Sequence, residues 1–274
     1  MSCPDCVKGS IHEGEPRGRE IKLHGLDSYV VEPQGRDVRG IIVVLPDAFG
    51  WKFVNTRLLA DNYANKSHYK IYLPDLMIGD AVPISMLELS RVISSPGNLL
   101  TRGYTLLVAL WVMIPFVIRN RFGQTSPIVR GFFEQLQKEE GANLPVGAAG
   151  FCWGGKHAFL LAHGTKVNSE PLIDAAFVGH PGALSLPSDA QKVILPVSVA
   201  VGDNDFQLSE ENAKKMRTVL EGKPEGMKGE VKIYPGMGHG FCLRAAPEKD
   251  VADRAVEAED QCITWFDTHF ERIN

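Results

Sequence analysis

A cysteine near the middle of the chain stands in a pattern that favours nucleophilic chemistry. Cys152 lies in the sequence GAAGFCWGGK, residues 147–156, between an apolar run typical of a strand and one typical of a helix. Gly150, Gly154 and Gly155 permit the sharp backbone turn that lifts a nucleophile above a sheet in the G-x-S-x-G motif. The N-terminus of a helix also favours the reactive thiolate. The pattern predicts a nucleophile; the alternative is a buried, inert thiol beside a tight turn.

An acid and a base follow at the ends of two later strand-like runs. Asp205 comes after the apolar run 195–201, and His239 stands in the sequence GMGHGF after the run 231–234. Parallel strands present their carboxyl ends at one edge of a sheet, so we expect both side chains to lie near Cys152. The chain order nucleophile, acid, histidine is that of α/β-hydrolases. A Cys152-His239-Asp205 triad is therefore predicted.

Three other residues compete for these roles. Asp203 shares a turn with the predicted acid, but we expect it to cap that turn through backbone hydrogen bonds. His180, which precedes a proline, competes with the predicted base; we expect it to be structural, with a substrate contact as the alternative. His157 lies on the helix after the cysteine and is assigned to packing or to the surface.

Eight strand candidates and five helix candidates position these residues. From the third strand onward, strands alternate with helices, which is typical of an α/β fold with a mainly parallel sheet. The first two strands are only a few residues apart and should form a hairpin. The expected strands cover residues 20–24, 28–32, 40–45, 69–74, 146–149, 175–178, 195–201 and 231–234, and the expected helices cover 54–66, 129–140, 154–162, 210–220 and 251–270.

Composition restricts the partners and the compartment. The 274 residues include 29 Lys and Arg against 33 Asp and Glu, and this net charge of -4 argues against a nucleic-acid partner. The five cysteines are odd in number and scattered, which argues against a disulfide scaffold and predicts a cytoplasmic protein. Cys3 and Cys6 have no second Cys/His pair at zinc-like spacing, so no metal site is expected. The first twenty residues lack the basic start and apolar core of a secretory signal.

The motifs resemble those of the dienelactone hydrolase family, particularly its fungal-type members. The resemblance spans nearly the whole chain and is carried by the sequences PDAFG at 46–50, GFCWGG at 150–155 and GHGF at 238–241, together with Asp205. It implies a single α/β-hydrolase domain over residues 1–274, a Cys-His-Asp triad, and hydrolysis of carboxymethylenebutenolide-type lactones or related esters without metal or organic cofactor. At Asp47 the bacterial members have a glutamate that contacts the resting cysteine.

Four further residues receive roles around the predicted triad. The backbone N–H groups of Trp153 and Ala48 are expected to form the oxyanion hole. Asp47 is expected to keep the resting thiol protonated, the alternative being that it only braces its own turn. Arg244 is a candidate anchor for a substrate carboxylate, with a surface arginine as the equal alternative.

The segment 76–129 is much longer than one strand crossover needs and should form a helical cap insertion. Its uncharged part, residues 106–118, is expected to be a buried helix whose Trp111 and Phe116 bind substrate. Thirteen helical residues reach about 20 Å, which is shorter than a bilayer core, and Pro115 should interrupt them. No membrane span is therefore expected; docking at a membrane surface through the flanking arginines is the alternative.

The predicted function is cysteine-dependent hydrolysis of lactones or carboxylic esters through a thioester acyl-enzyme. A thioesterase or polyketide-processing acyl hydrolase, acting on a bulky apolar substrate, is the nearest alternative. A catalytically silent fold that only binds a ligand is the alternative from another class. The expected partner is a small lactone or ester, and the sequence leaves a homodimer open.

Overall fold

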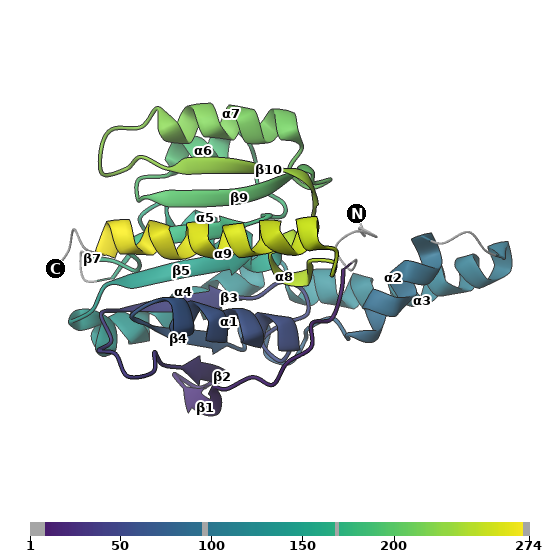
Figure 1. Ribbon diagram of the computed structural model, residues 1–274, viewed down its shortest axis with the longest axis horizontal. Helices are drawn as coiled ribbons and strands as arrows, with labels where there is room; N and C mark the ends of the chain where they lie inside the picture. Colours follow the sequence, from purple (N-terminus) through teal and green to yellow (C-terminus); the bar gives the residue numbers. More distant parts are fainter. Residues whose placement is uncertain (1–8, 95–97, 168–169, 271–274) are drawn as a thin grey trace.

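Eight strands form one sheet that helices cover on both faces (Figure 1). The computed structural model describes residues 9–94, 98–167 and 170–270. The strand order is β1-β2-β4-β3-β5-β8-β9-β10, with β1, β2 and β4 antiparallel to one another in turn and every later pairing parallel. The strands are β1 Arg19–Leu23, β2 Leu26–Val31, β3 Gly40–Leu45, β4 Tyr69–Pro74, β5 Val146–Phe151, β8 Ala175–Gly179, β9 Val197–Asn204 and β10 Glu230–Gly238.

The expected fold class is confirmed, and each of the eight expected strands lies in this sheet. The first two form the expected hairpin, in which Leu23 pairs with Leu26. A separate antiparallel pair was not expected: β6, Lys166–Val167, and β7, Glu170–Pro171, are each only two residues long. Such short segments carry no alternation from which a strand could be predicted.

The central strands are buried on both faces, as parallel strands between two helical layers must be. Along β3, Ile41, Val43 and Leu45 share one core with helices α4, α5, α6 and α7. Ile42 and Val44 point to the other face and share a second core with helices α1, α8 and α9. The helices are α1 Val54–Lys66, α2 Ser85–Ser94, α3 Leu99–Arg119, α4 Phe122–Lys138, α5 Trp153–Leu161, α6 Ser188–Lys192, α7 Glu210–Glu221, α8 Phe241–Arg244 and α9 Lys249–Phe270, with a 3-10 turn at Glu140–Ala142.

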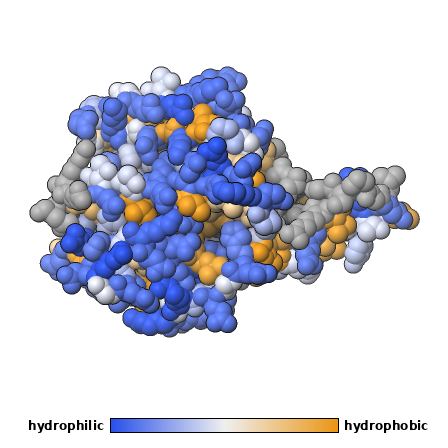
Figure 2. Space-filling model, in the orientation of Figure 1, coloured by the Kyte–Doolittle hydropathy of each residue, from blue (hydrophilic) through white to orange (hydrophobic). Residues whose placement is uncertain are grey.

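The inserted segment differs from the expected buried cap. Helices α2 and α3 project from the body as an arm (Figure 1), and some of the residues on the face of the arm seen in Figure 2 are hydrophobic. Helix α3 has 21 residues and continues through Pro115 to Arg119. The freed carbonyl opposite Pro115 belongs to Trp111, which is 79 % exposed, so water can satisfy it and the helix need not end there.

The expectation that Pro115 interrupts this helix is therefore wrong. Helix α3 is long and apolar enough, by length and composition, to cross a membrane, and it alone meets that test among the described residues. Only 22 % of its apolar stretch is buried, so it is not the enclosed helix that the sequence predicted. The arm ends before residue 129, because α4 begins at Phe122 and packs Val129 and Phe133 into the main core.

Candidate active site

Cys152 occupies the sharp turn between β5 and α5. Its backbone has φ 50° and ψ -108°, a conformation that residues other than glycine rarely adopt. The turn is held on both sides, since Cys152 N donates to Gly179 O at 3.1 Å and Gly182 N donates to Cys152 O at 3.1 Å. A Cβ at Gly154 would lie 2.2 Å from the Leu45 carbonyl oxygen, so this turn requires glycine there. The expected elbow is present.

Asp205 and His239 meet directly at the ends of β9 and β10. His239 Nδ1 lies 3.0 Å from both carboxylate oxygens of Asp205, and both side chains are fully buried. The carboxylate also accepts the backbone N–H groups of Gln207 and Leu208, at 2.8 and 3.3 Å. Asp203 instead accepts the N–H of Gly236 at 2.8 Å. An imidazole whose Nδ1 faces a fixed carboxylate presents Nε2 for proton transfer.

A cavity of about 280 Å³ opens onto the cysteine. The predicted residues Ala48, Phe116, Cys152 and Trp153 all line it, and so does Gln207 from the loop that holds Asp205. His239 and Arg244 line a separate cavity of about 370 Å³. The remaining residues around the smaller cavity are Met113, Val117, Asn120, Arg121, Phe122, Lys156, His157, Gly182 and Ala183.

The predicted oxyanion-hole residues follow the ends of two adjacent strands. Ala48 follows β3 and Trp153 follows β5, and Gly154 N ties the two turns together by donating to Pro46 O at 3.1 Å. The backbone N–H groups of Ala48 and Trp153 have no hydrogen-bond acceptor within the described part of the chain. Two uncommitted donors beside a candidate nucleophile are what an oxyanion requires.

Asp47 and Arg244 form a buried ion pair that the sequence analysis did not foresee. The Arg244 guanidinium donates to Asp47 Oδ2 and lies 5.3 Å from the centre of the Phe49 ring. The other carboxylate oxygen accepts the Phe49 N–H at 3.0 Å. Each residue had been given a separate role, and 197 positions separate them. Arg244 is buried rather than at the surface, and it lines the cavity of His239 instead of that of Cys152, so its role as a substrate anchor stays a prediction.

Trp111 also lies outside the cavity. It is on the exposed side of α3, whereas Met113 and Phe116 line the cavity from the same helix. On a helix, residues two apart face in different directions, and residues three apart share a face. The sequence analysis grouped Trp111 with Phe116 because both lie in one apolar run, which does not fix the face of the helix.

Two histidines near the elbow are held neutral by burial. Burial lowers the pKa of His180 well below its usual range, and neither ring nitrogen has a hydrogen-bond partner among the described residues. Its ring packs at 5.0 Å against that of His239. Burial lowers the pKa of His157 to about 4, with a smaller contribution from Lys156. His157 Nε2 lies 3.0 Å from Thr125 Oγ1.

The two other described thiols are unsuited to nucleophilic chemistry. Burial raises the pKa of Cys242 and of Cys262 well above the ordinary range of a thiol. Cys3 and Cys6 lie outside the described residues. Among the residues that the structure describes, no group of three or more His, Cys, Asp or Glu side chains could hold a metal ion.

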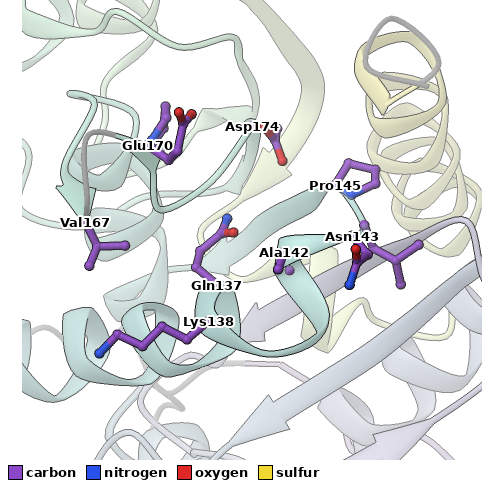
Figure 3. Close-up of a pocket in the computed structure, with 11 residues that line it drawn as sticks. Gln137, Lys138, Ala142, Asn143, Pro145, Val167, Glu170 and Asp174 are labelled. Atoms are coloured by element: carbon purple, nitrogen blue, oxygen red, sulfur yellow. The ribbon is translucent and has the colours of Figure 1, made fainter.

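Another cavity, of about 530 Å³, lies at the opposite end of the sheet (Figure 3). Pro145 and Asp174, which precede β5 and β8, are among its lining residues. The Asp174 carboxylate already accepts the N–H of Val146 at 2.7 Å, and Gln137 donates to Leu172 O at 3.1 Å. Its lining contains no cysteine, histidine or serine, so it does not compete as the centre of acyl transfer.

A family model places this architecture among known proteins. The model described as "Dienelactone hydrolase family" matches residues 26–270. The chain belongs to the dienelactone hydrolase family. The expected resemblance is thereby confirmed, and so is the expected enzyme class, a hydrolase of lactones or carboxylic esters.

Relatives within and around this family cover nearly the whole chain. Hydrolase pyvD of Aspergillus violaceofuscus is 27 % identical over 268 residues, which cover 97 % of this chain and 96 % of the relative. Dienlactone hydrolase 1 of Gibberella moniliformis is 25 % identical, with 87 % and 82 % covered. The crystal structure of a putative dienelactone hydrolase from Klebsiella pneumoniae has TM-score 0.59 at 20 % identity, covering 91 % of this chain and 96 % of its own, which supports the fold.

In this member of the dienelactone hydrolase family, several cavity residues were missed from sequence. Lys156 and His157 come three and four residues after Trp153 on α5, so the helical period itself could have brought them to the same face. Asn120 carried no such signal: its carbonyl accepts the Trp153 Nε1–H at 2.8 Å, a contact between α5 and the end of α3.

Proposed function

We propose that this hydrolase uses Cys152 as nucleophile, His239 as general base and Asp205 as the group that orients the base. The observation that carries the proposal is the buried Asp205–His239 pair at the ends of β9 and β10, on the sheet edge where β5 ends in a cysteine held at positive φ. A positive-φ residue other than glycine is costly and is typical of functional sites. Of the described cysteines, Cys152 is the one that lines a cavity able to admit a small molecule.

In the proposed mechanism, the sulfur attacks the substrate carbonyl carbon while His239 Nε2 takes the thiol proton. Asp205 stabilises the imidazolium that forms, and the N–H groups of Trp153 and Ala48 bind the oxyanion. Collapse forms the thioester and breaks the carbonyl–alkoxide bond, and His239 returns its proton to the leaving oxygen. In a lactone this step opens the ring and the alcohol stays on the acyl chain. His239 next deprotonates a water that attacks the thioester, releasing the acid and restoring the thiol.

The cavity favours a small lactone or ester. Its volume of about 280 Å³ lies just below the usual range for drug-sized ligands. Met113, Phe116 and Val117 supply an apolar wall, while Lys156 and Arg121 supply positive charge. A carboxylate on the substrate would therefore meet these two cations rather than Arg244. The apolar wall also suits an acyl thioester, which is the second candidate substrate.

Substitution of the proposed triad tests the mechanism. We expect Cys152→Ala and His239→Ala each to lower kcat/KM for a p-nitrophenyl ester by at least about a thousandfold. His180→Ala should lose far less, because the proposed mechanism gives this residue no proton-transfer step. Intact-mass analysis with a slowly hydrolysed lactone should detect an acyl adduct on the wild type and none on Cys152→Ala. Full turnover in Cys152→Ala would refute the proposal.

A substrate panel separates the two candidate activities. Lactones, simple esters and acyl thioesters of matched chain length would be compared with wild type and with Phe116→Ala. We expect lactones to have the highest kcat/KM, and Phe116→Ala to shift the preference toward longer acyl chains. A preference for long-chain thioesters would favour the alternative. We further propose a cytoplasmic location, since a reduced thiol is required and reducing compartments maintain it.

A further inference from the structure

Helix α3 carries two apolar faces on opposite sides. Ala109 and Met113 pack into a cluster with Phe49 and Phe53 of the body and with residues of α2. On the other side six residues recur at spacings of four and three, so that they fall within an arc of about 80°. This exposed stripe consists of Leu100, Tyr104, Leu107, Trp111, Ile114 and Ile118.

The stripe faces solvent along its whole length. Leu100 is 82 % exposed, Trp111 79 % and Leu107 66 %, and the other three are each more than half exposed. Soluble monomers rarely present a contiguous apolar surface of this kind unless it binds something. Trp and Tyr are the residues that concentrate where water meets lipid, because their rings are apolar and their N–H and O–H groups remain hydrated.

The charge of the surrounding segment selects the partner. Residues 85–121, which comprise both arm helices and the turn after them, contain four arginines and one glutamate, a formal charge of +3 in a chain whose total is -4. Arg119 is paired with Asp80. Arg102 and Arg121, near the two ends of the stripe, are exposed and form no ion pair with a described carboxylate. An apolar stripe with cations at its ends is complementary to an anionic lipid surface.

We infer that the exposed stripe of α3 docks this protein on the surface of an anionic phospholipid bilayer, with the helix lying in the plane of the interface. A spanning orientation would require α3 to leave Phe49 and Phe53, whereas docking in the plane keeps that packing intact. A second copy on the stripe would bring two +3 segments together, which charge repulsion opposes.

Vesicle flotation tests the inference without reference to catalysis. The protein would be mixed with phosphatidylcholine vesicles and with vesicles containing about a third phosphatidylserine. We expect recovery with the anionic vesicles and at least about tenfold weaker binding of Leu107→Ser/Ile114→Ser. The matched control is Val256→Ser, which removes an exposed apolar side chain from α9 and should bind like wild type. Thermal melting would verify that each variant is folded.

Two further measurements examine the charge and the orientation. Arg102→Gln/Arg121→Gln should bind anionic vesicles more weakly, whereas Lys138→Gln/Lys228→Gln, which removes two charges from the body, should not. Trp111 is the most exposed of the four tryptophans, so vesicles should shift the emission to the blue in wild type. Trp111→Phe should bind but lose that shift.

Several outcomes would overturn the inference. Equal binding to neutral and anionic vesicles would contradict the charge argument, and undiminished binding of Leu107→Ser/Ile114→Ser would show that the stripe is not the contact. If sedimentation velocity finds a wild-type dimer that this variant converts to monomers, and vesicles recover neither, a second copy covers the stripe instead.

Discussion

At the scale of single residues, the site contains two buried charged contacts of different kinds. The Asp205–His239 contact was predicted as a triad interaction, and the structure brings the two groups within hydrogen-bond distance. The Asp47–Arg244 ion pair was not predicted, because each partner was considered only in relation to substrate or thiol. The sequence indicates that Asp47 follows a strand. It does not indicate which distant helix residue packs over the end of that strand, so the pairing with Arg244 could not be predicted.

The two partners of the Asp47–Arg244 pair should affect the reactivity of the Cys152 thiol in opposite directions. Asp47→Asn leaves the guanidinium uncompensated and should speed iodoacetamide labelling of Cys152 at neutral pH, on the order of fivefold. Arg244→Gln leaves the carboxylate uncompensated and should slow labelling by a similar factor. The measurement is peptide mapping over time in a Cys3→Ser/Cys6→Ser background, without substrate.

The control for this pair is Asp260→Asn, which breaks an exposed ion pair with Lys66 and should leave the labelling rate unchanged. Unchanged rates in both Asp47→Asn and Arg244→Gln would mean that the pair only braces the turn through the Phe49 N–H. Changes of the same sign in both would indicate a disturbed site rather than an electrostatic effect.

His157 should make stability depend on pH. Its folded-state pKa is about 4 and its usual value is 6.5, so between these values the unfolded chain binds a proton that the folded chain does not. The free energy of unfolding is therefore highest above about pH 6.5 and falls toward pH 4, by roughly 3 kcal/mol from this residue. His157→Gln offers Thr125 a hydrogen-bonding group but does not titrate. Urea unfolding of both proteins across this range should show a smaller fall for the variant; parallel curves would exclude His157.

At the scale of elements, strands were predicted better than helices. Each expected strand is present because buried parallel strands are short apolar runs bounded by turns, as at 40–45 and 69–74. Helix starts were less accurate: α4 begins at Phe122, seven residues before the expected start at 129, and Pro127 lies inside it. Pro115 likewise lies inside α3. The error at Pro115 arises from treating proline as a helix boundary when exposure to water compensates for the lost hydrogen bond.

The elbow should be intolerant of any side chain at Gly154. A methyl group there would meet the Leu45 and Pro46 carbonyl oxygens at 2.2 and 2.6 Å, so Gly154→Ala must move β3 away from α5. We expect loss of several kcal/mol of stability and most of the activity. Gly131→Ala, on α4 with nothing within 4 Å of the added methyl, should instead stabilise by up to about 1 kcal/mol. Thermal unfolding of both variants measures the two effects on stability. Equal effects would contradict the close approach of α5 to the end of β3 at Gly154.

At the scale of the whole molecule, the exposure of the arm could not be predicted from the sequence. The sequence revealed that residues 106–118 are uncharged and apolar, and burial was the natural expectation. Because both sides of α3 are apolar, the helical period gives no polar face and therefore no direction. The fraction of such a helix that the body covers depends on how it packs against α2 and against the loop around Phe49, and that loop is far from it in sequence.

The arm also divides the charge of the molecule. The arm and the turn after it, residues 85–121, carry a formal charge of +3 and the rest of the chain carries -7, which makes the protein an electric dipole. A negatively charged surface attracts one end and repels the other, so diffusing molecules should arrive with the arm leading before any apolar contact forms. Salt screens this orientation over a Debye length of about 8 Å at physiological ionic strength. In stopped-flow mixing with anionic vesicles, added salt should therefore lower the association rate constant steeply. The dissociation rate constant should change little, because it depends on the apolar contact between the exposed stripe and the lipid.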